Sequence, residues 1–503
     1  MEKLMNYLNP FQYRFIAGCL AISHSLTGQA GQAPLADAVQ AGDAVQIETL
    51  LARSIDVDAP QIDKMTALHW AAYNDDAELA RQLLERGASA TVMNLYKVSP
   101  LYLACLNGNE DLVRLLLDSG VDPNTAVHGD ETALMTAART GKIGTVEALI
   151  EAGAEVDPKE PYGQSAIMWA AAEGHVEVVR KLLEAEADFN ASLMSGYTPF
   201  HFAVREGETA VVRLLLEAGV DVNEEMDVEG SSEKLPLNGT SPLILAVENG
   251  HYDLAVELLE AGADPNDQSS GFTALHTLTW IRKPDVGETS AGDPPPRGSG
   301  RRVSHQFILE LIERGADVNA RLQTGQKAAL RYVSDIGATP FFLAAKRADI
   351  FYMKLLVEHG ADPFVPNEDG CTPLMMAAGV ASRAPEEEAG TEEECLEAVK
   401  YLIELGADVN TVDGNGETAM HGAAYKNLPS MVKYLHEQGA AIEIWNTENA
   451  LGWTPLLIAE GYRPGNFKPS FVTVDAITEI MLANGVKPPT DPRPKAINEY
   501  RQN

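Results

Sequence analysis

The sequence is poor in cysteine and in positive charge. Its four cysteines are Cys19, Cys105, Cys371 and Cys395, and no two of them have the C-x-x-C spacing. Thiols so placed are too few for a disulfide scaffold, and they do not form a thiolate zinc site. Lysine and arginine together number 38 against 73 aspartate and glutamate residues, which gives a formal net charge of −35.

This charge balance bears on the class of partner. An acidic surface repels phosphate backbones and anionic lipids, because both are bound through lysine and arginine. Nucleic acids and membrane surfaces are therefore poor candidate partners, whereas a basic protein partner, or simply high solubility, fits better. The chain is expected to be a monomer that binds another protein.

Long apolar runs are also missing. After the N-terminus no stretch reaches the ~18 apolar residues of a membrane-spanning helix. The N-terminus itself has the layout of a secretory signal peptide, since Lys3 and Arg14 precede the mostly apolar residues 15–26, with Gly28 and Ala30 as small residues behind. We expect export to a periplasmic or extracellular site, with residues 1–30 removed after Ala30. The alternative is an amphipathic leader on a cytoplasmic protein.

A lipid anchor on Cys19 is a weaker expectation. Residues 16–19 read Ile-Ala-Gly-Cys, which looks like a lipobox. Only two residues separate Arg14 from this box, however, whereas an export leader needs about 7–15 apolar residues there.

Motifs of catalysis and of metal binding are scarce. H-E-x-x-H and G-x-S-x-G do not occur, and the G-x-G-x-x-A match at residues 414–419 is a turn before a helix rather than a nucleotide loop. The glutamate run at 386–388 and 392–394 lacks the spacing of a calcium loop and is expected to be a solvated acidic loop. We expect no catalytic, cofactor-binding or metal-binding residue and no cofactor.

Internal repetition is what the sequence has in abundance. The phrase Thr-Ala-Leu-His-Trp-Ala at residue 66 recurs in related forms, at first every 33 residues. Counting a degenerate first copy, the repeats start near residues 33, 66, 99, 132, 165, 198, 241, 273, 339, 372, 418 and 454.

Each position of the repeat has a physical reason. The opening Thr or Ser is a helix N-cap, and the Pro or Ala after it suits the first helical turn. Two residues before the cap most repeats have glycine, as a turn with positive φ requires, but three of them have Lys64, Lys97 and Asp130 there. A second apolar helix follows and usually ends at another glycine.

The phrase at Thr198, Thr-Pro-Phe-His, is close to the T-P-L-H signature of the ankyrin repeat, whose period is 33 residues. The sequence therefore resembles the ankyrin-repeat family, and we expect an exported form of bacterial type. The resemblance implies an all-α ankyrin-repeat solenoid of about 12 stacked helix-turn-helix repeats over residues 33–488, with 489–503 as a flexible tail.

The signature histidines have a structural explanation. His69, His201, His276 and His421 lie in non-adjacent repeats, too far apart to share one metal ion. We expect their rings to form hydrogen bonds with backbone groups or hydroxyls of the neighbouring turn.

Insertions break the period at several places. The longest is residues 280–303, and another is 382–394; shorter ones follow Glu224, Arg321 and Gly461. Insertions in a solenoid map to loops, which either bind a partner or accumulate neutral sequence changes. The 280–303 loop is locally cationic, so it suits either an acidic partner segment or the protein's own acidic surface.

The ankyrin resemblance implies a non-catalytic scaffold that recognises protein along its concave face. A structural spacer, or an enzyme with an unrecognised site in the insertions, remains the alternative. The resemblance places contacts on turn tips and on the exposed ends of the first helices, where tyrosine and arginine favour binding. The candidate contact residues are Tyr73, Tyr96, Lys97, Tyr162, Tyr197, Arg205, Trp280, Arg347, Tyr425 and Lys426.

Overall fold

A computed structural model describes residues 33–127, 129–228, 238–286, 296–324, 333–380, 382–462 and 469–489. The predicted signal peptide, Cys19 and almost all of the predicted tail lie outside these residues. The sequence predicted one continuous array, but the chain divides into two compact units, Met1–Leu193 and Met194–Asn503. Within the described residues every regular element is a helix, with one isolated β-bridge between Ala126 and Thr132.

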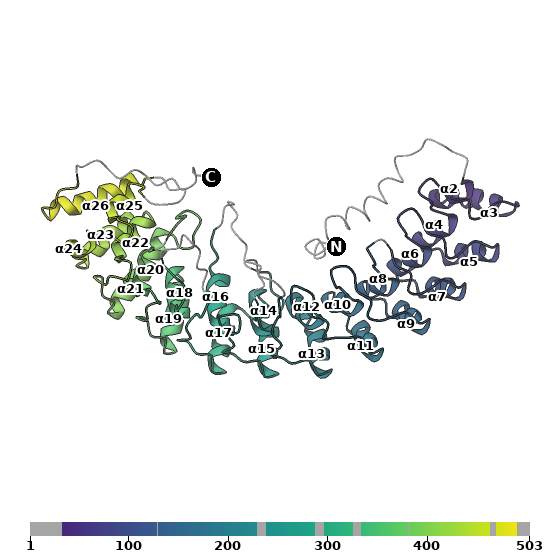
Figure 1. Ribbon diagram of the computed structural model, residues 1–503, viewed down its shortest axis with the longest axis horizontal. Coiled ribbons are helices and arrows are strands. Elements are labelled where there is room, and N and C mark those ends of the chain that lie inside the picture. Colours follow the sequence, from purple (N-terminus) through teal and green to yellow (C-terminus); the bar gives the residue numbers. More distant parts are fainter. Residues whose placement is uncertain are drawn as a thin grey trace. The chain divides into compact units, whose positions relative to one another are not determined.

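The first unit is a stack of helix pairs of regular length (Figure 1). In each pair a first helix is followed after a short turn by an antiparallel second helix. The pairs are α2 (Pro34–Ala41) with α3 (Ala44–Leu51), α4 (Ala67–Tyr73) with α5 (Ala77–Glu85), α6 (Pro100–Asn107) with α7 (Glu110–Asp118), α8 (Ala133–Thr140) with α9 (Ile143–Glu151), and α10 (Ala166–Ala172) with α11 (Val176–Glu184).

The second unit repeats the same pairing with longer connections. Its pairs are α12 (Pro199–Glu206) with α13 (Thr209–Glu217), α14 (Pro242–Glu248) with α15 (Tyr252–Glu260), α16 (Ala274–Arg282) with α17 (Ser304–Glu313), α18 (Pro340–Lys346) with α19 (Ile350–Glu358), α20 (Pro373–Ala377) with α21 (Glu392–Leu405), α22 (Ala419–Tyr425) with α23 (Pro429–Glu437), and α25 (Pro455–Ala459) with α26 (Phe471–Ala483), while α24 (Ile442–Trp445) is a short helix between pairs.

The first helices begin where the sequence predicts. The Ser99 hydroxyl accepts a hydrogen bond from the Tyr102 amide at 3.2 Å, and the Thr372 hydroxyl accepts one from Met375 at 3.3 Å. Each such bond satisfies an amide that has no partner inside the helix, and its loss typically costs about 1 kcal/mol.

The core of each unit lies between the helix pairs. Leu68 and Leu101 on neighbouring first helices are fully buried, as are Leu83 and Leu112 on the second helices. A single pair has too little apolar surface to cover itself, so each pair gains stability from its neighbours in the stack.

The turn before each first helix needs a positive φ. Glycine adopts it in most repeats, for example Gly163 at 91° and Gly370 at 78°. Lys64, Lys97 and Asp130 take the same conformation at 66°, 61° and 60°. The sequence predicted the turn correctly, and it is formed in these three repeats at a conformational cost of roughly 1 kcal/mol each.

The described parts of two insertions fold back onto the second unit. Residues 296–303, the arm, run against the turn between α14 and α15 and the start of α15 before α17 begins at Ser304. In the other insertion, Thr391 caps α21 and its N–H donates to the Glu394 carboxylate at 2.8 Å. The expectation of a solvated loop was therefore wrong for Glu392–Glu394, because they form the acidic first turn of a helix. There their negative charge interacts favourably with the helix dipole.

Candidate protein-binding surface

The signature histidines are part of the packing. His276 Nδ1 lies 2.9 Å from the Thr273 hydroxyl, and Nε2 lies 3.2 Å from the Ala338 carbonyl of the next repeat. Because the Thr273 amide also donates to Nδ1, the ring is neutral with its proton on Nε2. His69, His201 and His421 repeat this arrangement. The predicted bonding to a neighbouring turn is confirmed.

Burial keeps these rings uncharged. Desolvation lowers the pKa of His276 to about 4, and it does the same for His69, His201 and His421. The part of the chain that the structure describes contains no group of three or more His, Cys, Asp or Glu residues placed to hold a metal ion. None of its helices is long and apolar enough to span a bilayer.

The turn tips of the first unit expose apolar side chains beside lysines. Ile62 is 72% exposed and Leu95 57% exposed, each two residues before the positive-φ lysines Lys64 and Lys97, which are also exposed. The Leu95 amide donates to the Asp63 carbonyl at 2.9 Å, so the two tips are held side by side. Leu95 and Ile62 were missed by sequence reasoning, although apolar residues in a polar turn were a usable signal.

Two predicted tyrosines extend this surface. Tyr162, in another tip of the first unit, is 64% exposed. Tyr73, at the end of α4, is 37% exposed and packs edge-on against Trp70 with ring centroids 5.6 Å apart. Tyr96 lies in the same tip as Leu95 and Lys97 and is half-buried. These positions remain predicted contacts, and the structure leaves them accessible.

A partly buried polar ladder lies behind the tips of the first unit. Arg139 donates to the Glu131 carboxylate at 2.8 Å and lies over the Trp169 ring at 5.8 Å, while the Trp169 indole donates to Glu160 at 3.3 Å. Burial, with the nearby Glu131 carboxylate, raises the pKa of Glu160 to about 7. The ladder links α8 and α10, two neighbouring first helices of the first unit.

Three predicted contacts are corrected by their burial. Tyr197, Tyr425 and Lys426 are 7%, 4% and 5% exposed. The Tyr425 hydroxyl donates to Glu417 at 2.7 Å, and Lys426 donates to the Ala389 carbonyl of the 382–394 insertion. A side chain covered in this way has little surface left for a partner.

The remaining predicted contacts are engaged within the second unit. Arg205 lies over the Tyr197 ring at 5.3 Å, and Trp280 packs edge-on against Phe272 at 5.3 Å. Arg347 donates to the Lys283 carbonyl at 2.8 Å and forms an ion pair with Asp285. Of these three, Arg347 holds the insertion against the next repeat.

Three cations of the 280–303 insertion are paired with acidic residues of the protein itself. Arg282 binds Asp349 at 2.9 Å, Lys283 binds Glu394 at 2.9 Å, and Arg302 binds Asp253 at 3.3 Å. Of the two expectations for this loop, the structure shows the contact with the protein's own acidic residues. Its predicted part in partner choice stays a prediction.

Comparison with known proteins agrees with this architecture. A model of three-copy ankyrin repeats matches residues 16–95, 35–127, 101–192 and 134–226. A many-copy ankyrin model matches 341–379 and 388–436, and a single-repeat model matches 238–270.

Individual relatives share only part of their length with this chain. An ankyrin repeat and KH domain-containing protein of Caenorhabditis briggsae is 31% identical over 30% of this chain and 6% of that protein. Palmitoyltransferase AKR1 of Lachancea kluyveri is 28% identical over 30% of this chain and 17% of that protein. The crystal structure of the human ASB11 ankyrin repeat domain is 25% identical, with a TM-score of 0.40, over 46% of this chain and 99% of that domain.

Matches to ankyrin-repeat models recur from the start of the first unit to α23, and the helix pairs have the turns, caps and histidine contacts of that repeat. The chain is therefore an all-α solenoid of ankyrin repeats.

Proposed function

We propose that this protein is a non-catalytic scaffold that binds another protein through the turn tips and first helices of its first unit. Ankyrin repeats are in general modules of protein–protein interaction, and two tips of this unit expose the apolar side chains of Ile62 and Leu95. The contact surface consists of Ile62, Lys64, Tyr73, Leu95, Tyr96, Lys97 and Tyr162.

The single observation that carries the proposal is the backbone at Lys64 and Lys97. Both hold a positive φ that glycine adopts at the equivalent positions of later repeats, such as Gly196 and Gly370. A strained side chain persists where its surroundings or its function require it. Both lysines are exposed, so packing does not explain them, whereas a contact with a partner's carboxylates does.

The partner's chemistry follows from the surface. Exposed apolar side chains next to lysines suit a protein segment that carries apolar residues flanked by aspartate or glutamate. This local character differs from the net charge of −35, which by itself favours a basic partner. The tips are cationic points in an acidic molecule, and they orient the partner on approach.

A double variant, Lys64→Gly with Lys97→Gly, tests the proposal. Glycine relieves the backbone strain, so the fold should be at least as stable, while affinity for the native partner should fall about tenfold or more. The partner is first isolated with the tagged protein and identified by cross-linking of its acidic residues to Lys64 and Lys97. Binding of the purified pair is then measured by calorimetry.

Lys433→Ala is the matched control. Lys433 is an exposed lysine on α23 of the second unit, 3.8 Å from Glu479. This variant removes one positive charge at a site outside the tips, so the affinity for the partner should stay unchanged. If both variants bind like the wild type, the tips are not the contact surface and the proposal fails.

The proposed site of action is outside the cytoplasm, as the order of charged, apolar and small residues in 1–30 suggests. Intact-mass measurement of the natively expressed protein decides this. A mature chain beginning at Gly31 supports export, whereas a cytoplasmic chain that retains residues 1–30 contradicts it.

A further inference from the structure

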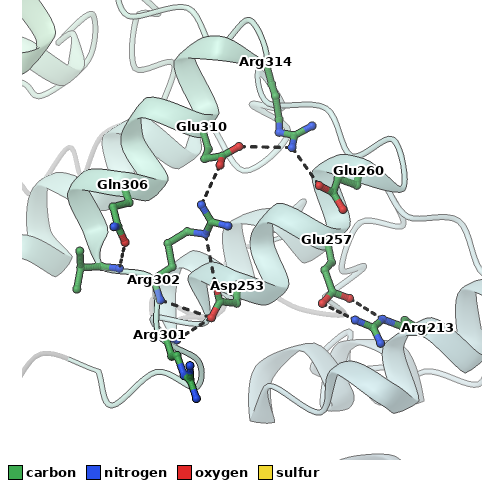
Figure 2. A network of polar contacts seen from close by, with 10 residues as sticks. Arg213, Asp253, Glu257, Glu260, Arg301, Arg302, Gln306, Glu310 and Arg314 are labelled. Carbon is green, nitrogen blue, oxygen red and sulfur yellow. Dashed lines mark hydrogen bonds and ion pairs between the residues drawn. The ribbon is translucent and has the colours of Figure 1, made fainter.

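Ion pairs tie second helices of the second unit to their neighbours in the stack (Figure 2). Arg213 of α13 binds Glu257 of α15 at 2.6 Å, and Glu260 of α15 binds Arg314 of α17 at 3.2 Å. A carboxylate on one second helix thus finds its cation on the helix beside it. The apolar side of a pair is likewise covered by the pair that follows.

The arm shows that an irregular segment can also provide cover. The Arg301 amide donates to Asp253 at 2.6 Å, and the Arg302 guanidinium lies 3.3 Å from the same carboxylate. The backbones approach so closely that a Cβ added to Gly298 would lie 1.8 Å from the Gly250 carbonyl oxygen. The chain therefore covers the acidic start of α15 with a basic segment of its own.

The last second helix, α26, exposes apolar side chains along one side. Phe471, Val472 and Leu482 are 75%, 66% and 57% exposed. Asp475 and Glu479 are exposed between them, and the Glu479 carboxylate is 3.8 Å from a lysine of α23. Steps of four and seven residues separate Phe471, Asp475 and Leu482, so these side chains lie on one side of the helix. We call these five residues the end face.

Earlier repeats show that this side normally faces a following helix. Leu482 lies three residues before Gly485, a glycine of positive φ that follows the helix. The residues at the same place in the four preceding repeats are half-buried, and they are Ile312, Val357, Ile403 and His436. Leu482 is exposed because no further pair follows α26 among the described residues.

The two ends of the array differ in polarity. A terminal repeat needs a polar outer face to stay soluble. The second helix of the first pair, α3, exposes one large apolar side chain, Val45, whereas α26 exposes three. The end face therefore lacks the polarity of a cap and is suited to being covered.

The charges of the end face select what can cover it. Asp475 and Glu479 lie on either side of the middle of α26, which runs from Phe471 to Ala483. A second copy that docked by the same face about a two-fold axis would bring these carboxylates against their counterparts, which is unfavourable. The end face instead fits a segment that carries lysine or arginine next to apolar side chains.

Residues 490–503, the part of the predicted tail outside the described residues, have this composition. Arg493 and Lys495 come first, and Ile497 and Tyr500 follow. From the C-terminal end of α26, the end face has the matching order, with its carboxylates before the apolar pair at the helix start.

The tail is also long enough for this contact. The 13 residues of α26 form a helix about 20 Å long. The chain from residue 490 to residue 497 spans up to roughly 26 Å when extended. Ile497 can therefore reach the start of the helix.

We propose that residues 490–503 fold back along α26 and cover the end face as the last layer of the array. Arg493 and Lys495 lie against the carboxylates of the end face, and Ile497 and Tyr500 pack on the apolar residues at the start of the helix. The contact is of the kind that the arm makes with α15. It closes the end of the array with the chain's own residues.

Hydrogen exchange on the full chain tests this contact. Ile497→Asp with Tyr500→Asp removes the apolar anchors of the tail, so the amides of α26 should exchange at least about threefold faster than in the wild type. The matched control is Gln502→Asp with Asn503→Asp, which adds the same charge to the same segment and should leave the exchange unchanged. Equal exchange in the wild type and the anchor variant would overturn the proposal, as would an equal loss of protection in the control.

A charge exchange separates specific pairing from a general effect on the helix. Asp475→Lys should repel the tail and speed the exchange of α26 by a similar factor. Adding Lys495→Glu restores opposite charges, so the exchange should return to within about twofold of the wild type. A double variant that exchanges as fast as Asp475→Lys alone would overturn the proposal.

Sedimentation tests the other occupant of the end face. The wild type should sediment as a monomer over the concentration range of the exchange experiment. A wild-type dimer that is lost in Phe471→Asp would assign the end face to a second copy and would overturn the proposal.

Discussion

The two units have the same repeat but use their turns differently. Two tips of the first unit combine Ile62 or Leu95 with a strained lysine. Tips of the second unit have glycine at that position, with an exposed apolar neighbour at Met194 but polar ones at Ser269 and Glu368. The second unit instead holds cations of its 280–303 insertion against its own acidic residues, as Arg282 is against Asp349. The first unit therefore keeps accessible surface at a cost in backbone strain, and the second uses similar side chains to secure its own irregular segments.

Loss of the ion pair between Arg282 and Asp349 should produce the largest difference in stability between the two units. Both side chains are largely buried, at 14% and 9% exposure, and Arg282 also lies over Tyr352 at 5.5 Å. Arg282→Ala leaves the Asp349 carboxylate buried without its partner, which should destabilise the second unit by about 3–5 kcal/mol. Hydrogen exchange, read peptide by peptide, should show the loss around α16 to α19 and little change in the first unit.

Arg114→Ala in the first unit is the control. Arg114 pairs with Glu151 at 2.7 Å at the surface, with side chains 39% and 61% exposed, and such ion pairs add little to stability. A loss of protection as large as that in Arg282→Ala would show that the difference between the units has been misjudged. The same experiment tests whether the 280–303 and 382–394 insertions are weak points of the array, as the sequence predicts.

Acid should also affect the units unequally. The signature histidines have a folded pKa of about 4 against an ordinary 6.5, so their contribution is complete above pH 6.5 and is lost as the pH falls toward 4. Carboxyls with a pKa raised to about 7 act in the opposite direction, since folding favours their protonated form. In the first unit His69 has the lowered pKa and Glu160 the raised pKa, so their opposite pH dependences of stability largely cancel.

Glu160→Gln should remove that cancellation. The variant should gain stability at pH 7, by up to about 3 kcal/mol, because a neutral side chain then occupies the buried position at every pH. Stability of the first unit should then fall more steeply between pH 6.5 and 4 than in the wild type, as measured by exchange of its peptides. A pH profile identical to that of the wild type would contradict this assignment of opposing groups.

The smallest expected effect concerns the strained tips. Lys97→Gly relieves a positive φ of 61° but adds freedom to the unfolded chain. The free energy of unfolding should therefore rise, by less than about 1 kcal/mol. Chemical denaturation measures it. Gly370→Lys, in the second unit, is the reverse exchange and should be destabilising by a similar amount. If Lys97→Gly is clearly destabilising, Lys97 serves the fold, and the difference between the tips is not functional.

Local chemistry in this chain was predictable from the sequence. The cap at Thr273, the hydrogen-bonded His276 and the positive φ at Gly163 all follow from residues within one repeat and its neighbour. A fixed period makes such contacts local, so reading one repeat predicts the others.

Contacts made by the insertions were not predictable. Lys426 occupies the position of an exposed contact, but the 382–394 insertion brings the Ala389 carbonyl onto its ammonium group. Tyr425 is covered in the same region by Glu417 and Asn449. The path of an irregular segment depends on long-range packing that no spacing encodes, so the burial of Lys426 could not be read from its position in the repeat.

The contact between Gly298 and Gly250 also has a meaning for related sequences. Glycine at 298 is required only while the arm is docked, whereas glycine at 250 is required by its own backbone conformation. In relatives that keep the docked arm, selection should hold both positions as glycine. Where the arm has been lost or freed, position 298 should drift while position 250 stays constant, so residue 298 serves as a marker of the arm's state that can be read without any structure.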